Sequence, residues 1–385
     1  MKFAYNPEWL QNLHIVKEAK QWMFSGLISK DQYNAIAEQH ASNFYHPNII
    51  IRILLLIATA VVLGAITGLL VLMFLQAEKI LSFLSLIYGI GSMIVLDRVF
   101  IASKNHYKSG ITEAILYHSV LFIMLGFVDM LAESPAPYAI VLTCLLAFTA
   151  YRYLDLISTM GSLCAFAWLV FYLLYQAGSA MQQIIPIVFI TLFTPLYFGF
   201  KQLKKKSAHE PWENCLIAAE AVCLLFIYTA GNYFVVRELS VNMMNLDLHE
   251  GQDIPLAFVF YGLTVLIPIL YLYFGLKDKD LVLIRVSLAV LAFSVFTFKY
   301  YFSLGHHEIT LTVSGLVLLG IAVSLLRWLK VPQYGYTREN ILNEKWANSN
   351  AQAFIVSQTL GAVKAPEVHQ FGGGESGGGG AASKF

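Results

Sequence analysis

Ionisable residues inside long apolar stretches are the part of this sequence best placed to do chemistry. Glu220 lies about eight residues into the stretch 212–236, and Arg285 lies about four residues into the stretch 281–303. Charged groups are costly in hydrocarbon, so each needs a partner or a functional role. Three alternatives follow for two residues at similar depth: a salt bridge between helices, with Arg285 otherwise extending to the membrane interface; a gating or ion-coupled site; or a water-filled cleft lined by Glu220.

Further polar residues suggest a second candidate cluster and a lone histidine. Asp129 and Glu133 are four residues apart and share a helical face, and Lys299 reaches a similar depth from the far end of its own stretch. A salt bridge at the rim, or plain exposure at the interface, is expected for this outer-side cluster. His118 lies in the middle of a stretch. An ordinary imidazole titrates near neutral pH, although a hydrogen bond to a neighbouring helix is the commoner role.

Complete catalytic motifs are missing near these residues. His307 and Glu308 begin the zinc motif HExxH, but Leu311 stands where the second histidine is needed. The segment that ends at Asp129 has Val128 in place of the second glycine of the GxGD motif of intramembrane aspartyl proteases. No GxSxG nucleophile turn lies near the end of a stretch. We therefore expect a protein that is not an enzyme and needs no cofactor or metal.

Helices must position these residues. The chain is 58% hydrophobic and 13% charged, against about 25% charged residues in soluble domains. Its apolar stretches are long enough to cross a bilayer, where a helix satisfies its own backbone hydrogen bonds. We predict an all-α polytopic transmembrane bundle of about ten spans, at about 49–75, 80–96, 111–131, 136–154, 156–175, 182–200, 212–236, 254–276, 281–303 and 308–329.

Lysine and arginine alternate between the connections in the way that the positive-inside rule describes. With the N-terminus in the cytoplasm, the opposite side keeps only Lys79 and Arg237. An even number of spans then returns the C-terminus to the cytoplasm, provided that the turn holding Arg152 and Asp155 separates two spans. The lipid bilayer is the first expected partner, and a net charge of +1 gives no indication of nucleic acid.

Small residues and prolines predict how the spans pack. Ala60, Gly64 and Gly68 recur every four residues and form a stripe that lets another helix approach closely. Three prolines, Pro186, Pro195 and Pro268, interrupt later stretches. Such breaks either free carbonyl groups that line a polar cavity or are ordinary kinks.

We predict that the first 48 residues form a cytoplasmic helical hairpin. Pro7 suits the first position of a helix, and Gly26 can end that helix in a left-handed cap. Ser29 and Gln32 then form a capping box that opens a second helix toward His40.

One short motif in this hairpin carries a family resemblance. The run Trp22-x-x-x-Gly26-Leu27-Ile28-Ser29-x-x-Gln32-x-x-x-Ile36 resembles the N-terminal motif of a family of predicted bacterial membrane proteins of unknown function (domain of unknown function 2157). In that family the motif is joined to a multi-pass helical core. The resemblance implies a protein of the bacterial inner membrane and transfers no activity.

The C-terminal arm completes the domain plan: a hairpin at 1–48, a bundle at 49–330, a partly helical cytoplasmic segment at 331–370 and a Gly-rich tail at 371–385. Glycine loses the most conformational entropy on ordering, so we expect the tail to be disordered. It is either a flexible end or a docking peptide whose two phenylalanines enter a partner's groove.

Two functions remain open on the sequence alone. The first is a non-catalytic scaffold or accessory protein, whose hairpin and tail contact a protein partner. The alternative is a small-molecule or ion transporter with a five-plus-five helix arrangement and a site built around Glu220 and Arg285. A water-accessible cavity at Glu220 would favour the transporter, whereas a sealed salt bridge would favour the scaffold.

Overall fold

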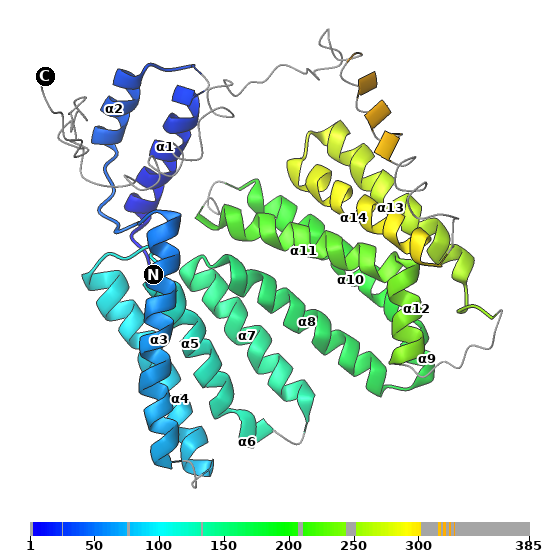
Figure 1. Cartoon of the computed structure of the whole chain (residues 1–385), viewed down its shortest axis with the longest axis horizontal. Helices are drawn as coiled ribbons and strands as arrows, with labels where there is room; N and C mark the ends of the chain where they lie inside the picture. Colours follow the sequence, from blue (N-terminus) through cyan, green and yellow to red (C-terminus); the bar gives the residue numbers. More distant parts are fainter. Residues whose placement is uncertain are drawn as a thin grey trace, which may run out of the picture. The chain divides into compact units, whose positions relative to one another are not determined.

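The computed structural model describes residues 3–24, 26–74, 78–131, 134–206, 211–243 and 252–301, together with single helical turns or residues at 315–316, 319–320, 323–324 and 327. All the secondary-structure elements in these ranges that are longer than a single β-bridge are helices (Figure 1). The predicted C-terminal arm and Gly-rich tail lie outside the described residues, as does most of the predicted span 308–329.

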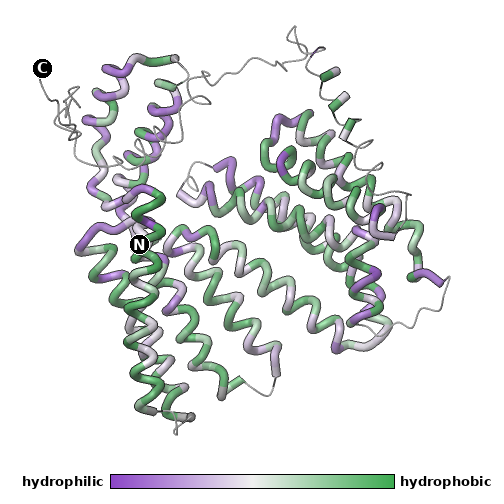
Figure 2. The backbone as a smooth tube through the Cα atoms, viewed as in Figure 1, coloured by the Kyte–Doolittle hydropathy of each residue, from purple (hydrophilic) through white to green (hydrophobic). Residues whose placement is uncertain are grey.

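Within the described residues, seven helices are long and apolar enough to cross a membrane. Figure 2 shows the contrast between the hydrophobic length of α3 and the more hydrophilic first two helices of the chain. These apolar helices indicate a membrane-embedded protein, as the composition predicts. The seven are α3 (Ile49–Phe74), α4 (Glu78–Val95) with its continuation η1 (Leu96–Ser103), α8 (Leu156–Gln176), α10 (Ile185–Lys204), α11 (Glu213–Gly231), α13 (Ala257–Asp278) and α14 (Leu281–Tyr301).

The remaining helices show where the predicted spans need adjustment. The stretch predicted at 111–131 divides into two helices, and the one at 212–236 ends at Gly231, where a separate helix follows. A π-helix, η1, occupies residues that were expected to form a loop. The additional helices are α1 (Pro7–Phe24), α2 (Lys30–Gln39), α5 (Ile111–Gly126), α6 (Val128–Leu131), α7 (Pro135–Tyr153), α9 (Ser179–Gln183) and α12 (Tyr233–Asn242).

The turn on which the predicted alternation of connections depends is present. Leu154 adopts a left-handed conformation with φ 54° and ends α7. Asp155 then caps α8, because its Oδ2 accepts a hydrogen bond of 2.7 Å from the backbone N–H of Ser158. Residues 135–176 therefore form two helices. A single longer helix would have removed this turn and with it the predicted alternation of basic and non-basic connections.

The chain forms two compact units. We call Asn6–Thr59 with Val99–Ala114 the N-terminal unit, and Ala60–Arg98 with the described residues from Ile115 onward, together with the first residues of the chain, the bundle unit. The N-terminal unit thus extends past residue 48 to include the start of α3 and the first residues of α5.

The core of the bundle unit is built around α11. More than half of α11 is buried, a larger share than in any other of the seven helices. Phe193 of α10 is fully buried and packs its ring 4.8 Å from that of Phe226. Leu163 from α8, Ile267 from α13 and Val290 from α14 complete the cluster around α11.

None of the three prolines expected to interrupt the spans breaks a helix. Pro195 lies inside α10 and Pro268 lies inside α13, whereas Pro186 is at the start of α10, where a missing N–H costs nothing. The prolines therefore do not divide α10 or α13 into half-helices.

Close helix packing in the bundle unit occurs at Gly89 and Gly126. A Cβ at Gly89 would lie 2.6 Å from the backbone nitrogen of Ile123, and one at Gly126 would lie 2.6 Å from the Cβ of Leu86. The hydroxyl groups of Ser92 and Ser119 are 2.9 Å apart at the same contact. Helices α4 and α5 therefore approach through small residues.

The predicted stripe on α3 has no such neighbour. Ala60, Gly64 and Gly68 are all exposed, and no described atom lies within 4 Å of a Cβ placed at either glycine. The expectation that this stripe seats another helix of the bundle is therefore not met within the described residues. Small residues at helical spacing occur on both α3 and α4, and only the packing decides which face is used.

These two glycine environments give a direct test of the packing. We expect Gly89→Ala to lower the free energy of unfolding by about 1–3 kcal/mol, because the methyl group overlaps a backbone atom. Gly64→Ala makes the same chemical change in open space, so it should be neutral or slightly stabilising, since alanine has the higher helix propensity. Reversible unfolding of the two variants in detergent compares them, and equal losses would contradict the assigned contact.

Candidate functional site

Glu220 is the most deeply buried charged residue that the structure describes in the bundle unit. Its side chain is fully buried on α11, and its Oε2 accepts a hydrogen bond of 2.8 Å from the Nζ of Lys204, the last residue of α10. Lys204 keeps 23% of its side chain exposed, so the pair lies close to one end of both helices. The bond joins the two helices of one hairpin and buries the carboxylate behind the lysine.

The predicted pairing of Glu220 with Arg285 is wrong. The buried positions of α14 include Leu283, Val286 and Val290, which define one face, and Arg285 is exposed on the opposite face. Depth along a helix predicts which residues lie at the same level, but it does not predict the rotation of each helix about its axis. Lys204 takes the place that Arg285 was expected to fill.

A second ion pair ties α10 to the connection between α13 and α14. The Nζ of Lys201 lies 2.9 Å from Oδ2 of Asp280, and Asp280 also accepts a hydrogen bond of 3.0 Å from the backbone N–H of Val282. Burial acts to raise the pKa of Asp280, but the bonds from Lys201 and the backbone outweigh it and leave that pKa below its ordinary value. Asp280 is therefore ionised and caps the start of α14.

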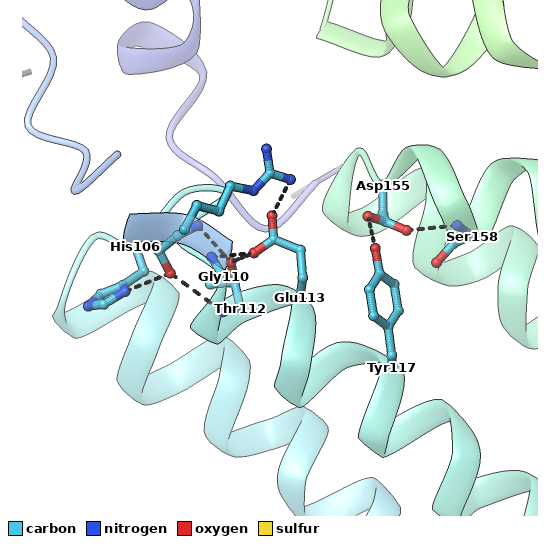
Figure 3. Close-up of polar contacts among 9 residues, drawn as sticks. His106, Gly110, Thr112, Glu113, Tyr117, Asp155 and Ser158 are labelled. Atoms are coloured by element: carbon cyan, nitrogen blue, oxygen red, sulfur yellow. Dashed lines mark hydrogen bonds and ion pairs between the residues drawn. The ribbon is translucent and has the colours of Figure 1, made fainter. Parts of the chain in front are cut away.

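A third ion pair in the bundle unit joins Asp97 to Arg152. The guanidinium Nε of Arg152 donates to Oδ2 of Asp97 over 3.1 Å, and a second guanidinium nitrogen bonds to the same oxygen. Beside it in the sequence, Asp155 accepts a hydrogen bond of 3.0 Å from the hydroxyl of Tyr117, as Figure 3 shows. The turn between α7 and α8 is thus held from two other helices.

The fourth ion pair lies in the N-terminal unit (Figure 3). Oε2 of Glu113 accepts hydrogen bonds from the backbone N–H of Gly110, at 2.7 Å, and from the hydroxyl of Thr112, at 2.9 Å. Its Oε1 lies 2.6 Å from a guanidinium nitrogen of Arg52. The sequence places Glu113 in the first turn of a helix, where the positive end of the helix dipole favours a carboxylate, but it does not predict Arg52 as partner.

Gly110 brings the start of α5 against the backbone of α3. It has φ +89°, and a Cβ there would overlap the carbonyl oxygen of Arg52 and lie 2.9 Å from the backbone nitrogen of Leu56. Only glycine suits both the conformation and the space. The salt bridge and the close approach therefore fix the same two helix ends.

The segment after α2 is joined to the connection between η1 and α5. The backbone N–H of Tyr45 donates to the carbonyl of Asn105 at 2.9 Å, and that of Tyr107 donates to the carbonyl of Tyr45 at 3.1 Å. Phe44 is buried, with the ring of Tyr107 stacked on it at 5.1 Å and the ring of Trp9 edge-on at 5.3 Å. These contacts connect α1 to the helix ends within the N-terminal unit.

His46 lies beside this junction. Burial, followed by the positive charges of Arg52 and Lys108, lowers the pKa of His46 below its ordinary value of 6.5. Burial and Lys104 likewise lower the pKa of His106, whose Nδ1 lies 2.9 Å from the hydroxyl of Ser109. Both imidazoles are therefore neutral at pH 7.

A polar network that the sequence did not predict surrounds the break between α11 and α12. Asn232 is fully buried and donates to the hydroxyls of Tyr228, at 2.9 Å, and Thr297, at 3.0 Å. Tyr233 donates to Asp253 over 2.7 Å and accepts a hydrogen bond of 2.9 Å from Arg237. The one sequence signal was Arg237, which stands out as a rare cation on its predicted side of the membrane.

The other predicted residues form no site among the described atoms. His118 packs its ring against two aromatic side chains, with ring centroids 4.6 Å from Phe122 and 5.6 Å from Tyr88. Lys299 is half-buried on α14, while the side chain of Asp129 and the whole of Glu133 lie outside the described residues. The predicted outer-side cluster of Asp129, Glu133 and Lys299 therefore stays a prediction.

These contacts assign the ionic groups a bracing role. Within the part of the chain that the structure describes, no group of three or more histidine, cysteine, aspartate or glutamate side chains is arranged to hold a metal ion. Each of Glu220, Asp280, Asp97 and Glu113 has a basic partner from a different helix. By sequence, all four pairs fall at or near connections on the side predicted to be cytoplasmic.

Comparison with protein-family models, with curated proteins and with solved structures finds no match to this chain.

Removing one partner of the buried pair should be costly. We expect Lys204→Met to lower the free energy of unfolding by about 3 kcal/mol, because it leaves the Glu220 carboxylate buried without a cation. The double variant Lys204→Met with Glu220→Leu should recover most of that loss, since an apolar pair of similar size needs no counter-charge. Unfolding of the three proteins in the same detergent measures the coupling, and strictly additive losses would mean that the two side chains do not interact.

Acidification should loosen the N-terminal unit. Because the folded-state pKa of His46 lies below 6.5, the unfolded state binds more protons below that pH. The stabilisation is therefore complete above about pH 6.5 and is lost as the pH falls through the folded-state pKa. Hydrogen exchange of residues 6–48 at pH 7.5 and pH 5 should show faster exchange at the lower pH in the unaltered protein. His46→Gln with His106→Gln should reduce this difference, and an undiminished difference would exclude the two histidines as its source.

Proposed function

We propose that this protein is a non-catalytic scaffold of the bacterial inner membrane, which presents its first two helices to a protein partner in the cytoplasm. The membrane assignment follows from the seven apolar helices. The distribution of lysine and arginine supports the cytoplasmic side. Membership of the family that shares the Trp22 to Ile36 motif is part of the same proposal.

The observation that carries the proposal is an exposed apolar tip on an otherwise polar pair of helices. Trp22 is 43% exposed and Leu27 is 72% exposed. Tryptophan is among the residues that contribute most to protein–protein binding when it becomes buried. A large aromatic ring and a leucine left in water at a turn therefore offer an anchor for a partner.

The turn itself explains why these two residues lie together. The backbone N–H of Leu27 donates to the carbonyl of Trp22 at 2.9 Å, and that of Gly26 donates to the carbonyl of Met23 at 3.1 Å, with Gly26 at φ 74°. This is the Schellman arrangement, which brings the residue before the helix end next to the residue after it. The capping box of Ser29 and Gln32 follows at once, as predicted. A purely structural turn needs the glycine and the caps, but it does not need a tryptophan.

The tip is also held in place. Phe44, which follows α2, packs on Trp9 of α1, and Tyr45 is hydrogen-bonded to the connection before α5. The Arg52–Glu113 salt bridge joins α5 in turn to α3 within the same unit. A rigid binding surface loses little conformational freedom on association. This supports presentation of a surface by the helices rather than a loose tether.

The transporter alternative has weaker support. Glu220 is fully buried against Lys204, and Arg285 is not its partner. One feature still favours a transport role, because Oε1 of Glu220 has no hydrogen-bond partner among the described residues. An intramembrane carboxylate with a free oxygen is a potential proton or cation site.

Substitutions separate the two functions. We expect Trp22→Ser with Leu27→Ser to weaken binding of the partner roughly 1,000-fold, since two anchor residues of about 2 kcal/mol each are removed. In cells this variant should reproduce the defect of a strain that lacks the protein, at an unchanged protein level. Glu220→Gln should leave the cells normal under the scaffold proposal.

The matched control changes two exposed polar residues of the same helix, Glu8→Ser with Gln11→Ser, which should have no effect. A photo-reactive residue at position 27 should cross-link to one larger species, and the same residue at position 11 should not. A normal cellular phenotype of the Trp22 and Leu27 variant, together with a defect of the Glu220→Gln strain, would reject the scaffold and favour the transporter.

A further inference from the structure

Arg285 is a cation on an otherwise apolar exposed face. Its neighbours one turn away on the same face of α14 are Leu281, 63% exposed, and Leu288, 56% exposed. Asp280, the acid nearest to it in sequence, is engaged with Lys201, and the buried Glu220 is engaged with Lys204. In a membrane this face meets lipid, where an arginine needs an anionic partner.

The direction of the side chain indicates where that partner lies. Side chains of an α-helix lean toward its N-terminus, and α14 begins at Leu281, one turn before Arg285. The guanidinium group therefore extends toward the helix end that adjoins Asp280. In a bilayer a group at this level reaches the phosphate layer while its stem stays in hydrocarbon.

Several exposed lysines lie near the same end of the bundle unit. A Cβ on Gly275 would lie 3.0 Å from the backbone nitrogen of Ile284, so the end of α13, with the exposed Lys277, packs beside the start of α14. The salt bridge from Lys201 to Asp280 brings the end of α10 to the same connection. The next residues after α10 are the exposed Lys205 and Lys206.

The charge that remains at this end is positive. Asp280 and Glu220 are neutralised by their lysine partners. Asp278 is a further acid, with a side chain 51% exposed and 3.9 Å from the Nζ of Lys201, and it offsets part of the excess. Glu213, half-buried in the first turn of α11, is another acid near this end. Lys205, Lys206, Lys277, Lys279 and Arg285 are all exposed, so cations still outnumber these two acids among the described side chains.

We propose that the ends of α10, α13 and the start of α14 bind the headgroup of an anionic phospholipid. Arg285 bonds the phosphate, for which its planar guanidinium group offers two parallel N–H donors. Lys277, Lys205 and Lys206 attract the net negative charge that distinguishes an anionic lipid from a zwitterionic one. The proposal shares the membrane setting with the scaffold function, but it does not depend on the partner of Trp22 and Leu27.

Lipid binding to the purified full-length chain tests this site. The protein in detergent is titrated with phosphatidylglycerol or with phosphatidylcholine, and the bound lipid is counted by native mass spectrometry. Arg285→Gln with Lys277→Gln should weaken phosphatidylglycerol binding roughly 30-fold, since each cation near an anionic surface contributes about 1 kcal/mol. Phosphatidylcholine binding should change much less.

A control of equal charge keeps the test specific. Lys17→Gln with Lys30→Gln removes two exposed cations from α1 and α2 and should leave phosphatidylglycerol binding unchanged. Arg285→Lys should retain part of the binding, and circular dichroism confirms that each variant is folded. Equal losses in both double variants would show that net charge alone attracts lipid, and unchanged binding in Arg285→Gln with Lys277→Gln would likewise overturn the site. Neither result bears on the Trp22 and Leu27 experiment, so the two proposals fail separately.

Discussion

A charge at the edge of hydrocarbon must find an opposite charge, and this constraint organises the ends of the helices. Water compensates an ion at a soluble surface, but an apolar helix end offers little of it. Glu220, Asp280, Asp97 and Glu113 therefore each bond a lysine or arginine from another helix. The same basic residues set the predicted orientation of the chain and brace its helices, so one group of side chains serves both purposes.

Composition and local pattern were enough to predict the helical class, most helix positions and the caps. The left-handed Gly26, the box of Ser29 and Gln32, and the turn before Asp155 depend on neighbouring residues only, so a local reading finds them. The partners across helices were beyond such a reading. Lys204 rather than Arg285 meets Glu220, and Gly89 rather than Gly64 meets another helix. Both outcomes depend on how each helix is rotated about its axis, which the packing of the whole bundle decides.

The contrast between satisfied and unsatisfied surface separates structure from function in this molecule. The buried polar groups around Asn232 and Glu113 are bonded to neighbours from their own unit, as groups that stabilise a fold must be. Trp22, Leu27 and Arg285 are different, because each is exposed in an environment that does not suit it. An aromatic ring in water and a cation beside lipid both lack a favourable partner, which is why protein and lipid partners are proposed for them rather than for the ion pairs.

Gly110 has a consequence for how this protein can change over evolutionary time. One ion pair can be exchanged for another, or for an apolar pair, through intermediates that lose only part of the stability. No such route exists at Gly110, where a positive φ and the carbonyl of Arg52 leave no room for any side chain. Descendants of this sequence are therefore expected to vary the charged residues around the junction while they keep glycine at position 110.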